Sequence, residues 1–231
     1  MRKIFIACDS SNVSEIRKII AKTKTKKLNI GYKFGLEFLY TKNGRKFISK
    51  LQNKILFADY KISDIPNTSV QAIKSLSDLK NLNYITVHVS SGLDCLKAIK
   101  KTAKKINKKL KVLGVTILTS FSDKSLKKIG YNNSVKKIVI KQAKIAKLAK
   151  LDGIVCSGHE AKFLKKICTN MEIITPGIRL KGDNVGDQKR VMSPKEAFSN
   201  GATSIVVGRS ITKGNINKNM KNLISSLTDE T

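Results

Sequence analysis

The chain of 231 residues is 41% hydrophobic and 27% charged, which predicts one soluble α/β domain over residues 1–231 and leaves little room for a second. No apolar run approaches the roughly 20 residues of a membrane span, and the N-terminus lacks a signal-peptide pattern. The net charge of +30 would ordinarily indicate a nucleic-acid or membrane partner, but the lysines are spread along helical stretches and aromatic side chains are few. This spread favours a solvated compositional bias over a working basic surface, so we expect neither partner.

Short apolar runs alternate with longer amphipathic segments along the whole chain. The runs predicted as strands are Lys3–Cys8, Asn29–Phe34, Lys54–Ala58, Tyr84–His88, Lys111–Thr116, Gly153–Cys156, Glu172–Ile174 and Ser204–Val207. The segments predicted as helices are Val13–Thr23, Leu36–Leu51, Ser69–Lys80, Gly92–Ile106, Val135–Ala149, Glu160–Ile167, Pro194–Ser199 and Ile211–Leu227. This alternation predicts a (β/α)8 TIM barrel, with a Rossmann-like open sheet as the lesser alternative.

The cysteines are scattered and form no Cys-x-x-Cys pair, and two of them lie inside apolar runs. They are Cys8, Cys95, Cys156 and Cys168. Isolated cysteines of this kind are usually buried thiols, so we expect structural cysteines and a reducing cytoplasm.

Polar and special residues fall where the functional residues of a TIM barrel lie, at the C-terminal ends of the strands. They are Asp9, Lys33, Asp59, His88, Ser120, Ser157, Pro176 and Arg209. His88 has no neighbouring His, Cys or Glu at metal-ligand spacing, so a structural or supporting role is favoured for it. His159 is predicted at the start of a helix.

The sharpest local pattern is the stretch Asp59–Asp64. Residues two apart on a strand point to the same side, so Asp59 and Lys61 should share a face at the barrel mouth. Asp64 follows in the loop, and Lys33 comes from the neighbouring strand. Charges taken out of water are costly unless paired, so such an array indicates a function. From spacing alone, a solvated strand end with two salt bridges explains the pattern equally well.

The segment Asp59–Thr68, DYKISDIPNT, closely resembles the signature of orotidine 5′-monophosphate decarboxylases. Further resemblances to that family follow in order along the chain, at Ile6–Asp9, Lys33–Glu37, Leu118–Ser120, Val155–Ser157, Thr175–Arg179 with Gly186–Arg190, and Val206–Ser210. The chain departs from the commonest family pattern at Ser63, where many members have His, and at Ser90–Ser91 and Gly158–His159.

The resemblance implies conversion of orotidine 5′-monophosphate to uridine 5′-monophosphate and CO2, the last step of de novo UMP synthesis, by a homodimer with shared active sites. It implies no metal and no organic cofactor. Lys61 would protonate the C6 carbanion, Asp59 and the partner subunit's Asp64 would lie near the departing carboxylate, and Lys33 would complete the charged network. The substrate-binding residues that the resemblance implies are Asp9, Thr68, Ser120, Gln188, Gly208 and Arg209.

Two alternatives remain at this point. A Mg²⁺-dependent 3-keto-gulonate 6-phosphate decarboxylase or hexulose-phosphate synthase would look similar around Ala58–Asp64, but such enzymes bind the metal with a Glu on the second strand. Here that strand presents Lys33, a cation that would repel Mg²⁺. A basic nucleic-acid-binding barrel would explain the net charge, and would leave Asp59, Lys61 and Asp64 without a role.

Overall fold

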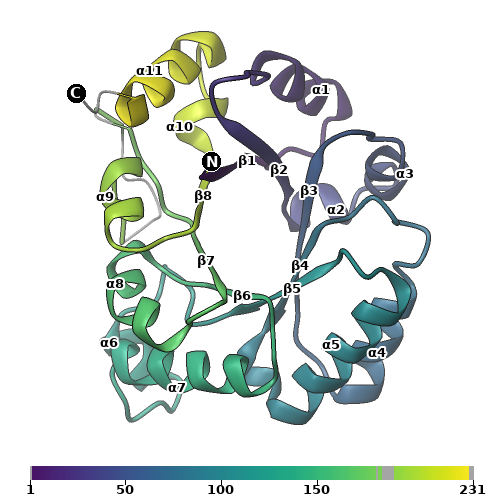
Figure 1. The fold of residues 1–231 in the computed structure, drawn as a ribbon, viewed down its shortest axis with the longest axis vertical. Helices are drawn as coiled ribbons and strands as arrows, with labels where there is room; N and C mark the ends of the chain where they lie inside the picture. The colour runs from purple at the N-terminus through teal and green to yellow at the C-terminus, as the bar shows by residue number, and fades with distance from the viewer. Residues whose placement is uncertain (1, 181, 184–189, 229–231) are drawn as a thin grey trace.

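The computed structural model describes residues 2–180, 182–183 and 190–228. Its parallel strands pair in chain order from β1 to β8, and β8 pairs with β1 to close a barrel (Figure 1). The strands are β1 Lys3–Cys8, β2 Asn29–Phe34, β3 Ile55–Ile62, β4 Tyr84–His88, β5 Lys111–Val115, β6 Gly153–Val155, β7 Glu172–Thr175 and β8 Ser204–Val207. The predicted TIM barrel is confirmed, and the open sheet is excluded.

Helices surround the barrel and cover the outer face of its sheet (Figure 1). They are α1 Val13–Lys22, α2 Leu36–Leu39, α3 Gly44–Ser49, α4 Pro66–Lys74, the 3-10 helix η1 Val89–Ser91, α5 Leu93–Ile106, α6 Asp123–Lys128, α7 Val135–Leu148, α8 Gly158–Ile167, α9 Pro194–Ser199, α10 Arg209–Thr212 and α11 Ile216–Thr228. Among the described residues, none of these helices is long and apolar enough to span a membrane.

Two helices expected to be continuous are each broken in two. The expected helix Leu36–Leu51 turns between α2 and α3, where the Gly44 amide donates to the Thr41 carbonyl. A Cβ on Gly44 would lie 2.2 Å from the Phe38 carbonyl oxygen, so only glycine fits this tight return. The expected helix Ile211–Leu227 is divided into α10 and α11 near Gly214, whose φ is +70°.

Other boundaries differ more modestly. The helix expected at Ser69–Lys80 begins earlier, at Pro66, and ends at Lys74. Helix α6 was not expected; it begins with a capping box in which Ser122 and Ser125 satisfy each other's backbone amides. The most consequential difference is β3, which was expected to end at Ala58 and continues to Ile62. Asp59 and Lys61 therefore lie within the strand, and Asp64 follows it.

The apolar core has two parts on either side of the sheet. The larger part fills the space between the sheet and the helices. The smaller part fills the inside of the barrel, where the ring centroid of Phe5 lies 5.2 Å from those of both Phe57 and Tyr84. A Cβ on Gly31 would lie 2.8 Å from the Phe5 ring, so this glycine makes room for the aromatic layer.

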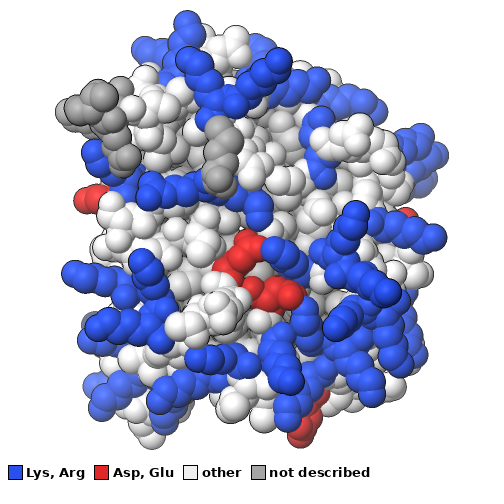
Figure 2. All heavy atoms as spheres, in the orientation of Figure 1, with Lys and Arg blue, Asp and Glu red and all other residues white. Residues whose placement is uncertain are grey.

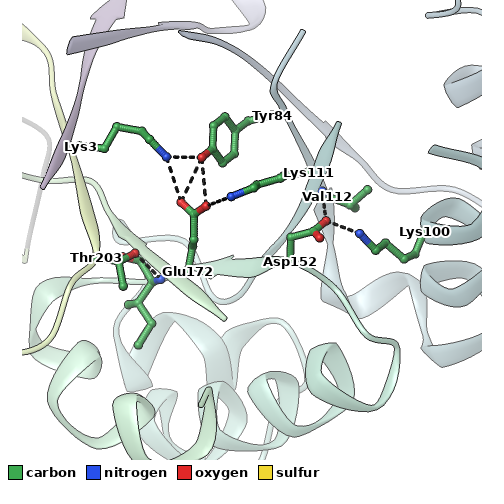
Figure 3. A network of polar contacts seen from close by, with 9 residues as sticks. Lys3, Tyr84, Lys100, Lys111, Val112, Asp152, Glu172 and Thr203 are labelled. Carbon is green, nitrogen blue, oxygen red and sulfur yellow. Dashed lines mark hydrogen bonds and ion pairs between the residues drawn. The ribbon is translucent and has the colours of Figure 1, made fainter. Parts of the chain in front are cut away.

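The amino end of the barrel is closed by a polar cluster from the starts of β1, β4, β5 and β7 (Figure 3). Lys3 Nζ lies 3.5 Å from the Glu172 carboxylate, Tyr84 donates to the same carboxylate at 3.0 Å, and Lys111 also pairs with it. Burial alone would raise the pKa of Glu172, but the hydrogen bond from Lys111 and the charges of both lysines hold it below its usual value. Glu172 is therefore an anion that holds four strands together.

We expect Glu172→Gln to lower the free energy of unfolding at neutral pH by about 1–3 kcal/mol, since the partly buried Lys3 and Lys111 would lose their counter-charge. Because the folded-state pKa is depressed, the carboxylate's contribution is present above the unfolded value of about 4.3 and is lost as the pH falls through the folded one. Urea unfolding of both proteins at neutral pH and near pH 3 measures this difference, which should shrink in acid. Equal stability at neutral pH would show that the cluster does not stabilise the barrel.

Candidate active site

A cavity of about 360 Å³ opens at the carboxyl ends of the strands, opposite the polar cluster. Its floor is apolar and continues the core inside the barrel, through Ala7, Phe57, Val115, Val155 and Val206. Its rim comes from the ends of several strands and the loops after them, and includes Asp9, Lys33, Asp59, Lys61, Leu118, Thr119, Ser120, Cys156, Pro176, Gly177, Arg179, Gly208 and Arg209. A polar rim above an apolar floor suits a ligand with both a flat ring and charged groups.

Four charged side chains form a chain of contacts along one wall of the cavity. Lys61 Nζ lies 2.7 Å from Asp59 Oδ2, and Lys33 Nζ lies 3.6 Å from the same oxygen. Lys33 Nζ also donates to Asp9 Oδ1 at 3.1 Å. Lys33 and Asp59 are each only 9% exposed. The order Asp9, Lys33, Asp59, Lys61 therefore alternates anion and cation from β1 across β2 to β3.

Mutual pairing keeps the two most buried members charged. Burial alone would raise the pKa of Asp59, but Lys33 and Lys61 outweigh it and lower that pKa. Burial alone would lower the pKa of Lys33, but Asp59 and Asp9 outweigh it and raise that pKa. The wall thus carries two carboxylates and two ammonium groups in an enclosed space, where electrostatic effects are stronger than in water.

The backbone that presents Asp59 and Lys61 is not a regular strand. Pairing of β3 with β4 shifts register between Ala58 and Ile62, and Lys61 has a left-handed φ of +50°. The two side chains meet as expected, but simple alternation along a strand is not the whole reason. Extra residues accommodated in β3 form a bulge, and bulges commonly re-aim side chains beside functional sites.

Thr86 on β4 fills the position opposite this bulge, and the sequence analysis did not single it out. Its hydroxyl accepts from the Lys61 amide at 2.9 Å and donates to Asp59 Oδ1 at 2.8 Å. The side chain has no solvent exposure. The signal in the sequence was a threonine between the apolar residues Ile85 and Val87, on the strand face that points into the barrel.

The remaining predicted residues divide into three groups. Asp9, Ser120, Gly208 and Arg209 all line the cavity. Asp64 and Thr68 do not: both are exposed, outside the cavity, and the Asp64 carboxylate accepts from the Ile65 amide at 2.7 Å. Gln188 lies outside the described residues.

Asp9 reaches the wall because a glycine follows β2. A Cβ on Gly35 would lie 2.5 Å from Asp9 Oδ1, so any other residue there would displace the carboxylate from Lys33. Asp9 remains exposed on its other side, facing the cavity.

Arg190 connects two of the loops that form the rim. Its guanidinium pairs with Glu160 in the first turn of α8 and donates to the Leu118 carbonyl at 3.1 Å. Glu160 in turn caps α8 by accepting from the Ser157 amide. The loops after β5 and β6 are thereby fixed to each other and to the chain that enters α9.

The histidines and cysteines make no metal site. Among the described residues, no three His, Cys, Asp or Glu side chains gather as a metal ion would require. All four cysteines are buried free thiols, as expected, and burial raises the pKa of Cys8 to about 12. His159 lies in the first turn of α8, as predicted. His88 is half-buried, and burial together with the Lys61 charge lowers its pKa.

Comparison with known proteins agrees with this geometry. Residues 2–219 match the family described as Orotidine 5'-phosphate decarboxylase / HUMPS. The chain is 42% identical over 222 residues to the orotidine 5'-phosphate decarboxylase of Prochlorococcus marinus (strain MIT 9215), covering 91% of this chain and 89% of that protein. It is 36% identical over 214 residues to the enzyme of the same name from Idiomarina loihiensis, covering 91% of each.

Solved structures give the same result for the fold. The orotidine 5'-phosphate decarboxylase of Lactobacillus acidophilus superposes with a TM-score of 0.83 at 30% identity, covering 99% of this chain and 100% of that one. The enzyme from Methanocaldococcus jannaschii, complexed with the inhibitor BMP, superposes with a TM-score of 0.77 at 26% identity over the same shares. The resemblance read from the sequence motifs is confirmed, and the chain belongs to the orotidine 5'-phosphate decarboxylase / HUMPS family.

Proposed function

We propose that the chain decarboxylates orotidine 5′-monophosphate to uridine 5′-monophosphate and CO2, as the last step of de novo UMP synthesis. The observation that carries this proposal is the alternating array Asp9, Lys33, Asp59 and Lys61 in a cavity that also holds Arg209. The names of the relatives support it, because they specify this decarboxylase within a family that also includes the HUMPS enzymes.

Lys61 is the proposed proton donor. When the bond between C6 and the carboxylate breaks, its electron pair stays on C6 in the plane of the ring, where no electron sink is available. An ammonium group aimed at C6 stabilises that charge as it develops and then transfers a proton to it. Lys61 suits this role because it is half-buried at the cavity wall and is oriented by Asp59 at 2.7 Å.

Asp59 and the partner subunit's Asp64 are proposed to lie beside the substrate carboxylate. Their negative charge would disfavour the bound carboxylate relative to the neutral CO2 that leaves. Lys33 would hydrogen-bond the ribose while bridging Asp9 and Asp59, with which it already pairs. The network then serves both binding and chemistry.

The remaining contacts are proposed to bind the ends of the nucleotide. Asp9 would accept from the ribose hydroxyls and Ser120 would contact the pyrimidine. Arg209 would make a forked contact with the phosphate, and Gly208 would let the backbone amide approach it. Gln188 would complete the phosphate site, and phosphate binding energy would help to organise the reacting end.

We further propose that the enzyme is a homodimer with shared sites and works in the cytoplasm. Asp64 and Thr68 lie outside the cavity of their own chain, beside Ile65, which is 66% exposed. Ile65 lies between Asp64 and Thr68 in the sequence, and an apolar side chain of that exposure suits burial against a second copy of the chain. The buried free thiols favour a reducing compartment.

Nucleic acid and metal ions have no part in the proposal. In the face drawn in Figure 2, the Lys and Arg side chains lie on every side of the view instead of forming one stripe, which favours a solvated surface over a nucleic-acid site. A Mg²⁺-dependent sugar-phosphate activity is less supported, because Lys33 occupies the place on β2 where a carboxylate ligand would be needed.

Purified protein incubated with orotidine 5′-monophosphate should convert it to uridine 5′-monophosphate, which the change in pyrimidine absorbance follows. The rate should survive exhaustive EDTA treatment, since the array neutralises its own charges without a metal. Activity that disappears with EDTA and returns with Mg²⁺ would favour the sugar-phosphate alternative. Absence of turnover under both conditions would contradict the proposed function itself.

Lys61→Ala should reduce turnover to less than about a hundredth of the unmodified rate, because a general acid contributes roughly 10²–10⁴-fold. The matched control is Lys141→Ala, which removes the same charge from an exposed position on α7. Circular dichroism should show both variants folded. Turnover of Lys61→Ala above that limit would exclude Lys61 as the proton donor.

Mixed dimers test the shared site. Homodimers of Lys61→Ala and of Asp64→Asn should both be nearly inactive. In a heterodimer, one site carries both changes and the other combines intact Lys61 with the partner subunit's intact Asp64, so about one working site of two should return. Mass spectrometry would verify subunit exchange. Activity that stays at the homodimer level after exchange would place Asp64 within its own chain's site.

A further inference from the structure

The Thr86 side chain bonds both to the carboxylate of Asp59 and to the backbone of Lys61, beneath the cavity wall. A hydroxyl has one donor and two acceptor sites. Here the donor serves Asp59 Oδ1 at 2.8 Å, and one acceptor serves the Lys61 amide at 2.9 Å. The hydroxyl therefore joins the two residues that the proposed reaction needs most.

The bond to Asp59 determines which carboxylate oxygen faces the lysines. Oδ1 is occupied by Thr86, while Oδ2 lies 2.7 Å from Lys61 Nζ and 3.6 Å from Lys33 Nζ. Without the hydroxyl, the carboxylate would be held only through Oδ2, its rotation would be less restricted, and the buried Oδ1 would lose its donor. The shared position of Oδ2 between two cations depends on Oδ1 being fixed.

The bond to Lys61 holds the backbone from which the ammonium group extends. Lys61 has a φ of +50°, a conformation that is unfavourable for residues other than glycine. Its amide cannot follow the regular ladder, because β3 and β4 shift register between Ala58 and Ile62. The Thr86 hydroxyl supplies the acceptor that the ladder does not, so it offsets part of the cost of the bulge.

We propose that Thr86 is a positioning residue of the active site, whose hydroxyl fixes the Asp59 carboxylate and the bulged Lys61 backbone in one geometry. The inference rests on the proposed function for its catalytic consequence. Thr86 lies beneath the cavity wall with no exposed surface and is absent from the cavity lining, so it acts through its two partners.

Thr86→Val keeps the shape of the side chain and removes both hydrogen bonds. We expect it to lower kcat by about 10- to 100-fold, the range expected for losing a hydrogen bond to a charged group. KM should change by less than about threefold, because the proposed phosphate contacts lie elsewhere. Thr86→Ser, which retains the hydroxyl, should keep most of the activity. Should Thr86→Val fail to fold, Thr86→Ala makes the same deletion with a smaller side chain.

The matched control is Thr23→Val. Thr23 is equally buried and its hydroxyl also makes two hydrogen bonds, with the Ile19 carbonyl and the Tyr32 hydroxyl, but at the end of α1. It should lose stability in urea without losing kcat. Loss of kcat in Thr23→Val to the same extent as in Thr86→Val would reduce the effect to general destabilisation and overturn the proposal.

A second readout follows the carboxylate itself. The groups around Asp59 are Lys33 from β2, Lys61 from β3 and His88 from β4, with Asp9 beyond Lys33. Donation from Thr86 favours the charged carboxylate, so Thr86→Val should raise the pKa of Asp59 and move the acid limb of the kcat profile to higher pH. Thr86→Ser should leave the limb in place.

Carbon-detected NMR of the Asp59 carboxyl measures the same titration without any turnover. If the unmodified protein does not act on orotidine 5′-monophosphate, the proposed function fails, and this titration still tests Thr86. If the unmodified protein is active, the inference is overturned by a Thr86→Val protein with kcat within about threefold of it and an unshifted Asp59 titration. A Thr86→Ser protein as impaired as Thr86→Val would overturn it equally.

Discussion

The need to keep buried charges paired is the constraint on which the rest of this structure depends. Lys33 and Asp59 are almost completely removed from water, and either one alone would lose its charge or destabilise the fold. Each is held in its charged form by neighbours on the same strand or on an adjacent strand, so the pairing of β1, β2 and β3 side by side makes the array possible. Closure of the barrel then places the ends of β7 and β8 across the same cavity from this array.

The strands and the order of the barrel could be predicted from the sequence because parallel strands buried on both faces appear as continuous apolar runs. The charged residues could be predicted as a group because they fall at the ends of those runs. The bulge in β3 could not, since a strand period of two gives no sign of where a register shifts, and Lys61 is not a residue that favours a positive φ. The contribution of Thr86 depends on that bulge and was missed for the same reason.

Breaks in helices were missed for a related reason. The expected helices Leu36–Leu51 and Ile211–Leu227 each joined two shorter segments, because a pattern of apolar positions does not mark a tight turn between them. The close approach of Gly44 to the Phe38 carbonyl belongs to this local turn, and apolar periodicity does not reveal it. For Asp64 and Thr68, the sequence motif predicts a role that the single chain does not display. Both residues lie outside the cavity of their own chain.

The polar cluster at the amino end of the barrel determines where a substrate can enter and where products can leave. Lys3, Tyr84, Lys111 and Glu172 close that end, and the layer of Phe5 and Phe57 above them leaves the interior filled with side chains. Among the described residues, the cavity is therefore open only at the carboxyl ends of the strands. In the proposed reaction, CO2 and uridine 5′-monophosphate would leave at the carboxyl ends of the strands, where the substrate enters, so the two products would share one exit among the described residues.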